Sequence, residues 1–229
     1  MNKIQVKILD HNLNGMPIFL ARLTQRGHLI NNMDDLMSLY DECINKKPST
    51  YMMTMPHNTI RRMSYMTVAI VGLSTKAVSQ LRTHATRLTF MSTSTQYSSY
   101  EGRSDNFVLP QGLDDETVRQ MTEAYAKIEG QYAKLIKLGI DKDKVGYLLP
   151  QGLRKALVIS GNLKDWQYVI KLRLCHRNTE EVQYIMRLLL DEIEKEAGPE
   201  FIQGMLPSCA NNPQGCKEGR FCCGKRFVR

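Results

Sequence analysis

The sequence has few aromatic residues and no long apolar run. Phe, Trp and Tyr make up 7% of its 229 residues, and no uncharged apolar stretch approaches the roughly 18 residues of a membrane span. The first residues, MNKIQVKILDHN, lack the apolar block of a signal peptide. These absences argue against a membrane protein and predict a cytoplasmic location.

The sequence also lacks a concentrated basic tract. The formal net charge is +8, but Lys and Arg residues are spread along the chain. Such a charge favours an anionic partner, and nucleotide phosphates satisfy it as well as nucleic acid does. A basic nucleic-acid-binding protein is the alternative, but no reading helix, RNP-like strand or zinc knuckle supports it.

What is present is a mixed α/β pattern without internal repeats. Apolar residues alternate with polar ones over residues 4–8, which predicts a half-buried strand, and a helix is expected from about residue 34 to 45. A second strand is predicted over 65–71, ended by Gly72. Ser74 is then a suitable cap for a helix over 76–83.

Two longer helices are predicted in the second half of the chain. Asp114 opens one that ends at Gly139, and Asn178 opens another that ends at Gly198, with Glu181 in a capping-box position. Their apolar residues recur every three or four positions, as an amphipathic helix requires. These stripes are Val118, Met121, Tyr125, Ile128, Tyr132 and Leu135, then Val182, Ile185, Met186, Leu189 and Ile193.

The most informative segment is residues 72–97, GLSTKAVSQLRTHATRLTFMSTSTQY. Its dense run of Arg, His, Ser, Thr and Gln cannot form a core. The predicted strand and helix bring this run to the end of a helix, so we expect it to bind a polar, anionic ligand.

This segment resembles the signature of flavin-dependent thymidylate synthases, the ThyX family, which is roughly G-x-S-R-x-x-x-x-Q-x-x-R-H-R-x-x-S-x-N-x-x-S-x-R-Y. With one extra residue after His84, the matching positions are Gly72, Ser74, Gln80, His84, Ser94 and Tyr97. The resemblance extends from VKILDHN to VQYIMR and so covers most of the chain. It implies an α/β (α+β) fold with a central, mostly antiparallel sheet and long helices, in a homotetramer with active sites at subunit interfaces.

The resemblance implies reductive methylation of dUMP to dTMP, with FAD as cofactor and NADPH and methylenetetrahydrofolate as co-substrates. In such an enzyme the protein supplies position and electrostatics more than a nucleophile. Catalytic roles are implied for Arg173 and Ser94. The residues expected to bind the nucleotide are Gln80, Ser94, Gln96 and Arg173. Those expected to bind FAD are Arg82, His84, Arg87 and Asn162.

Several positions depart from the family pattern. Its Arg-His-Arg is Thr83-His84-Ala85 here, and we hypothesise that the nearby Arg82 and Arg87 restore the lost guanidinium groups. Gln96 replaces an arginine, which weakens one contact to the nucleotide phosphate. Further departures are Arg62, Met63, Met91, Ser92 and Gly146. Hydroxymethylation of dUMP, transfer to another pyrimidine nucleotide, and nucleotide binding without catalysis therefore remain open.

The chain is expected to divide into a catalytic domain over 1–205 and a Cys-rich tail over 206–229. The tail contains Cys209, Cys216, Cys222 and Cys223. Four clustered thiols in a cytosolic protein suggest zinc before a disulfide, but the spacing lacks paired C-x2-C knuckles. A zinc site and reduced structural or redox-labile thiols both remain open.

Each site residue also has a purely structural interpretation. His84 would then be a capping or core histidine, residues 92–98 an exposed edge or loop, and Arg173 part of a solvated helix face. Lys144 and Lys155 are expected to be surface residues.

Overall fold

A computed structural model describes residues 4–55, 57–101, 105–212 and 214–229. At its centre lies a four-stranded sheet with the order β1-β2-β4-β3, in which every neighbouring pair is antiparallel. The strands are β1 (Gln5–His11), β2 (Tyr65–Ser74), β3 (Thr89–Ser92) and β4 (Arg154–Asn162). The expected α/β class with an antiparallel sheet is confirmed.

Strand β2 runs further than the sequence predicts. Gly72 does not end it, because a φ of 91° at this residue lets the chain bulge between Val71 and Leu73 and then resume pairing with β4. The strand therefore continues to Ser74, whose hydroxyl accepts a hydrogen bond from Ala77 N at 3.0 Å. The predicted cap is confirmed, and helix α5 (Thr75–Arg82) begins one residue earlier than expected.

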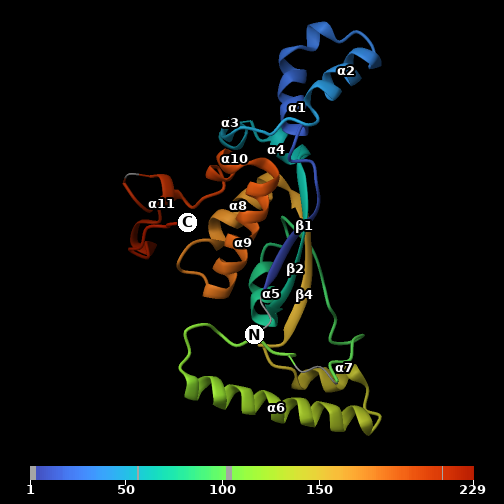
Figure 1. Ribbon diagram of the computed structural model, residues 1–229, viewed down its shortest axis with the longest axis vertical. Helices are drawn as coiled ribbons and strands as arrows, with labels where there is room; N and C mark the ends of the chain where they lie inside the picture. The colour runs from blue at the N-terminus through green and yellow to red at the C-terminus, as the bar shows by residue number, and fades with distance from the viewer. Residues whose placement is uncertain (1–3, 56, 102–104, 213) are drawn as a thin grey trace.

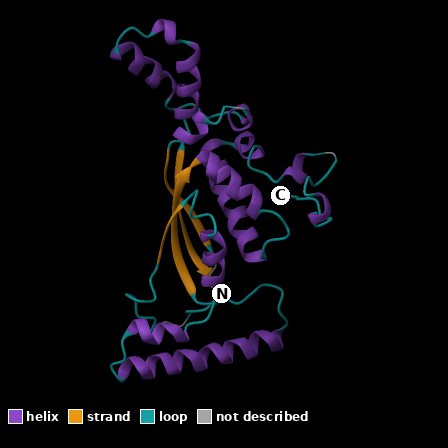
Figure 2. Ribbon diagram, turned by 180° about the vertical axis from the view of Figure 1, so that it is seen from behind, coloured by secondary structure: helices purple, strands orange, loops and turns teal. Residues whose placement is uncertain are grey.

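Helices cover one face of the sheet, as the two opposite views show (Figure 1, Figure 2). They are α5, α8 (Leu163–Arg173) and α9 (Glu180–Ala197), and α10 (Pro199–Gln203) packs on α9. The apolar stripe predicted for α9 is fully buried, and Trp166 of α8 donates from its indole N–H to Met66 O on β2 at 2.9 Å. On the other face, Val71, Met91 and Val158 are exposed.

Helical segments project from both ends of this central body (Figure 1). At one end lie α1 (Met16–Gln25), α2 (Met33–Cys43), α3 (Thr50–Thr54) and α4 (Thr59–Met63); at the other lie α6 (Asp115–Lys137) and α7 (Lys142–Val145). Helix α6 is capped by Asp114, as predicted. Of its apolar stripe only Tyr132 is buried. No described helix is long and apolar enough to cross a membrane.

The start of α9 differs from the predicted capping box. Thr179, not Asn178, is the cap residue, and Glu181 does not fold back on the helix end. Its carboxylate instead accepts hydrogen bonds from Ser74 N at 2.7 Å and Ser74 Oγ at 2.6 Å. A long-range pair thus replaces the local one and ties α9 to the junction of β2 and α5.

The C-terminal tail packs on the helices of the central body. It holds α11 (Ser208–Asn211) and a short 3-10 helix (Gly219–Phe221). Phe227 is 4% exposed and belongs to the main core, with the Arg187 guanidinium 4.7 Å from its ring centroid. Arg229 bonds to Asp191 and Glu194 of α9. The division between residues 205 and 206 stays a prediction.

Candidate functional site

Arg173, at the C-terminal end of α8, gathers several predicted site residues. Its Nε donates to Nε2 of His84 at 2.9 Å, and its Nη2 donates to Gln80 O at 2.9 Å and Thr83 Oγ1 at 2.7 Å. Its Nη1 donates to Asn178 Oδ1 at 2.8 Å. Arg173 therefore is not a solvated surface residue, since its guanidinium fixes the turn that follows α5.

His84 is held neutral in this arrangement. It is 7% exposed, and burial, with the charges of Arg173 and Arg87, lowers its pKa. A guanidinium is always protonated, so His84 Nε2 must accept and the ring proton must lie on Nδ1. The imidazole also meets Tyr168 in a T-shaped arrangement, with ring centroids 6.1 Å apart and an interplanar angle of 82°.

Tyr168 and Asp165 extend this group along α8. The Arg87 guanidinium lies 4.2 Å from the Tyr168 ring centroid, and its Nη1 donates to Asp165 Oδ1 at 3.0 Å. Asn162 caps α8: its Oδ1 accepts from Asp165 N at 3.0 Å, and its Nδ2 donates to Asp165 Oδ2 at 2.7 Å. The structure thus places Arg87 and Asn162 on one carboxylate, that of Asp165. The whole group, called the His84 cluster below, is His84, Arg87, Asn162, Asp165, Tyr168 and Arg173.

The other predicted residues lie on α5, which holds Gln80 and Arg82, and just beyond β3, where Ser94 and Gln96 lie. Arg82 Nη2 donates to Ser92 Oγ at 2.8 Å, and Gln80 Oε1 accepts from Thr179 at 2.8 Å. Ser94 Oγ accepts from the backbone N–H groups of Gln96 at 3.0 Å and Tyr97 at 3.2 Å. Ser94 therefore shapes a turn, and its hydroxyl donates no hydrogen bond to another described residue.

Two groups of predicted site residues are consequently separated within one chain. Asn162, a member of the His84 cluster, ends β4, whereas Thr93, just before Ser94, donates its backbone N–H to Ala156 O at 3.0 Å. Between Asn162 and Ala156 the strand spans about 20 Å, because strands rise about 3.3 Å per residue. The structure brings Gln80, His84 and Arg173 together, whereas Asn162 and Ser94 lie near opposite ends of β4.

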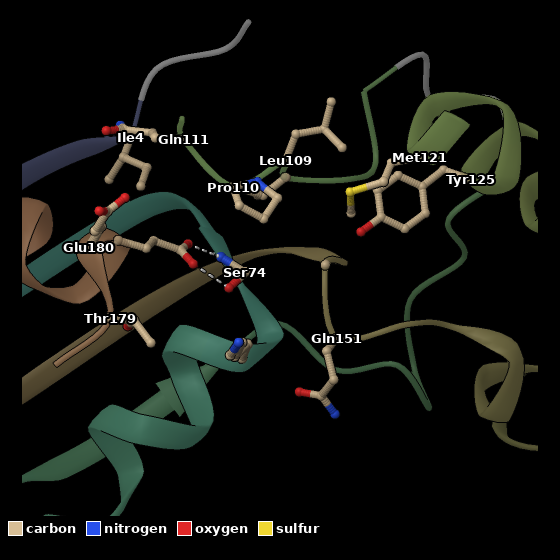
Figure 3. A pocket seen from close by; sticks show the side chains of 14 residues that line it. Ile4, Ser74, Leu109, Pro110, Gln111, Met121, Tyr125, Gln151, Thr179 and Glu180 are labelled. Atoms are coloured by element: carbon tan, nitrogen blue, oxygen red, sulfur yellow. Dashed lines mark hydrogen bonds between the residues drawn. The ribbon is translucent and has the colours of Figure 1, made fainter. Parts of the chain in front are cut away.

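Ser74, a signature residue, lies on a different cavity, of about 410 Å³ (Figure 3). Figure 3 shows its paired hydrogen bonds on one side and Met121 and Tyr125 of α6 on the other. Tyr125 stacks on Phe107 with ring centroids 4.4 Å apart, and burial raises its pKa. The Ser74 side chain is occupied by the helix cap and Glu181, so its role here is structural.

The prediction that Lys155 is a surface residue is wrong. Its side chain reaches under the turn formed by residues 93–100, where only 7% of the residue is exposed. Sequence reasoning also missed Asp165 and Tyr168. The spacing of Asp165 from Asn162 signals a helix cap. No local pattern predicts that Tyr168 contacts Arg87 and His84, which lie 81 and 84 positions earlier in the sequence. Lys144 is exposed, as predicted.

The tail gives no support to the zinc hypothesis. Among the described residues, no three or more His, Cys, Asp or Glu side chains are placed to hold a metal ion. The Glu218 N–H acts to lower the pKa of Cys216, but burial and the thiols of Cys222 and Cys209 outweigh it and raise the pKa.

The fold and the His84 cluster define an α/β protein with a polar, cationic site suited to an anionic nucleotide. The model of the family described as "Thymidylate synthase complementing protein" matches residues 8–199. The chain belongs to this family, and the expected ThyX relationship is confirmed.

Curated relatives and solved structures agree with this assignment. A flavin-dependent thymidylate synthase of Pyrococcus abyssi is 28% identical over 176 residues, covering 70% of this chain and 72% of the relative. One from Geobacter sulfurreducens is 25% identical over 175 residues, covering 76% and 74%.

Two solved structures share the fold. Thymidylate synthase X from Helicobacter pylori, crystallised with FAD and dUMP, matches with a TM-score of 0.64 and 18% identity, over 89% of this chain and 99% of that one. PolB, a UMP/dUMP methylase from Streptomyces cacaoi bound with 5-Br dUMP, matches with a TM-score of 0.67 and 19% identity, over 90% and 98%.

Proposed function

We propose that this protein is a flavin-dependent thymidylate synthase, which reductively methylates dUMP to dTMP with FAD as cofactor. NADPH and methylenetetrahydrofolate are its co-substrates. The observation that carries the proposal is the His84 cluster: a family-signature histidine and an arginine 89 positions later are joined by a 2.9 Å hydrogen bond. Family membership over residues 8–199 supports the same reaction.

The His84 cluster fits an anionic flavin nucleotide. Arg87 and Arg173 carry two positive charges against the one carboxylate of Asp165, so a positive excess remains for a pyrophosphate. Tyr168, 46% exposed, offers part of a flat aromatic surface beside them. Bound FAD would carry reducing equivalents from NADPH, and the residues proposed to hold it are Arg82, His84, Arg87 and Asn162.

The nucleotide side of the site is proposed to use Gln80, Ser94, Gln96 and Arg173. The turn at Ser94 is held by two backbone N–H bonds to Oγ, which aim its hydroxyl without consuming its proton. Arg173 already donates hydrogen bonds to His84 and to the end of α5. A nucleotide bound to its guanidinium would therefore be coupled to the position of the whole cluster. Catalytic roles are also proposed for Ser94 and Arg173.

We also propose a homotetramer in which each site combines residues of more than one copy. Asn162 of the His84 cluster lies about 20 Å along β4 from Ala156, which pairs beside Ser94, and this supports the proposal because one chain does not bring all the predicted residues around a single small ligand. The uncovered sheet face, where Met91 is 74% exposed, and the half-exposed stripe of α6 are apolar surfaces suited to such contacts.

The absorption spectrum of the purified protein tests the cofactor assignment. Addition of FAD is expected to give a bound oxidised-flavin spectrum, which dUMP then perturbs. A protein that never acquires this spectrum would sink the proposal.

Product analysis with dUMP and with UMP would separate the neighbouring reactions. Thymidylate is the expected product from dUMP, a hydroxymethyl product would favour the alternative without final reduction, and preferential methylation of UMP would identify a different nucleotide. The fold shared with a UMP/dUMP methylase makes UMP the informative competitor.

A further inference from the structure

A half-open cavity of about 730 Å³ lies beside the turn formed by residues 93–100. Its walls include Gly72, Thr93, Ser98, Ser99, Tyr100 and Lys155. This volume falls within the range of small-molecule sites, and the walls are rich in hydroxyl groups. The cavity is therefore suited to a polar ligand of nucleotide size.

Lys155 is the buried cation of this cavity. Its ammonium donates to Thr93 O at 3.0 Å and to Tyr100 Oη at 3.0 Å, and Tyr100 in turn donates to Ser94 O at 3.2 Å. Both partners of Lys155 are neutral acceptors. An ammonium has three N–H groups, so these bonds leave a donor for a further partner.

No carboxylate balances this charge in the described part of the chain. None of the ion pairs there involves Lys155. Among the described residues that line the cavity, Asp105 is the one acid; it lies beside Arg154, which also lines the cavity, with its Oδ2 3.9 Å from the Arg154 Nε. Burying a cation without a counter-charge is costly. An anion bound in the cavity would remove that cost.

We infer that this cavity binds the phosphate of the nucleotide substrate and that Lys155 is its principal cation. The inference rests on the proposed function for the identity of the ligand. Residues 95–97, at the tip of the turn, carry no basic side chain that could bind a phosphate. Lys155 supplies the positive charge instead, since lysine binds phosphate as a point charge. The hydrogen bond from Tyr100 to Ser94 connects this anion site to the predicted nucleotide-binding serine.

Calorimetric titration of three ligands tests this assignment: dUMP, deoxyuridine without its phosphate, and inorganic phosphate. Wild-type protein is compared with Lys155→Met, which keeps the aliphatic stem, with Lys155→Arg, and with the exposed-lysine control Lys144→Met. We expect Lys155→Met to weaken dUMP binding by about 30-fold or more and to abolish the phosphate response. The affinity of Lys155→Met for deoxyuridine, and the affinities of Lys144→Met for all three ligands, should stay within about twofold of wild type.

Thermal unfolding without ligand separates this role from a structural one. Removing an uncompensated buried charge is expected to leave the melting temperature of Lys155→Met unchanged or raise it.

Equal losses of dUMP and deoxyuridine affinity, an undiminished response to phosphate, or dissociation of an oligomer with unchanged phosphate binding would each overturn the inference. If Lys155→Met forms thymidylate and binds dUMP with unaltered affinity, this anion site is rejected and the proposed function stays intact. A phosphate response that depends on Lys155 would uphold the anion site even if no thymidylate formed.

Discussion

Arg173 Nε donates to His84 Nε2 across 2.9 Å, and this bond joins the last turn of α8 to the residues that follow α5. Arg173 has three more acceptors on this turn and on Asn178, so its loss would release both segments. The pair thus links a residue of the family signature to a helix far along the chain.

Replacing Arg173 should therefore abolish catalysis. We expect Arg173→Ala to lower kcat/KM by at least about 100-fold, and Arg173→Lys to recover little, because lysine lacks the planar fork that serves several acceptors. Steady-state assays with dUMP check this, with Arg119→Ala on the exposed side of α6 as the control. Normal turnover in Arg173→Ala would reject its assigned role.

The neutral state of His84 predicts a pH dependence of stability. Its pKa is lowered in the folded protein, so the unfolded chain binds more protons near and below the ordinary value of about 6.5. The contribution of His84 to stability is then complete above that value and is lost as pH falls toward the lowered folded pKa.

Melting temperatures between pH 5 and 8 test this, with His84→Gln as a variant that still accepts a hydrogen bond but does not titrate. The stability advantage of wild type over His84→Gln should shrink as the pH decreases. Parallel profiles for the two proteins would contradict the assignment.

Gly161 and Leu88 should be energetically coupled. A Cβ at position 161 would lie 2.3 Å from Leu88 Cδ2, and Leu88 is almost completely buried. We expect Gly161→Ala to cost about 1–3 kcal/mol by overpacking and Leu88→Ala about 2–5 kcal/mol by leaving a cavity. Because the second change removes the clashing methyl, the double variant should lose less than the sum. Additive losses in denaturant unfolding would show that the strand and turn adapt independently.

The tail should contribute to stability mainly through Phe227. Phe227→Ala is expected to cost about 3–5 kcal/mol, because the ring is buried in the main core. Arg229→Ala, which removes two partly exposed ion pairs, should cost less, about 1 kcal/mol. If a chain ending at residue 205 unfolds at the same temperature as the full protein, the packing of the tail is irrelevant to stability.

The sequence predicts the elements whose signals are local. The stripe and cap of α6, the burial of α9 and the Ser74 cap all follow from periodicity and capping chemistry. The errors arise where a distant partner competes with a local one. Glu181 bonds to Ser74 instead of its own helix end, and β2 passes through Gly72 because β4 supplies partners beyond the bulge.

The site is predicted less fully for the same reason. His84, Gln80 and Arg173 lie in recognisable motifs, and the structure brings them together. Tyr168 and Lys155 have no motif, and their positions depend on how α8 and β4 pack against residues 84–100. A lysine in a strand is predicted to be a surface residue, and only the structure shows that the turn formed by residues 93–100 covers Lys155.

Measurement of dTMP formation with complete and incomplete mixtures tests the central claim most directly. The protein is incubated with dUMP, FAD, NADPH and methylenetetrahydrofolate, and each component is then omitted in turn, with Arg173→Ala as the blank. We predict that dTMP accumulates in the complete mixture and that no omission mixture or blank approaches it. Flavin-loaded protein that makes no methylated nucleotide from dUMP in the complete mixture would contradict the account.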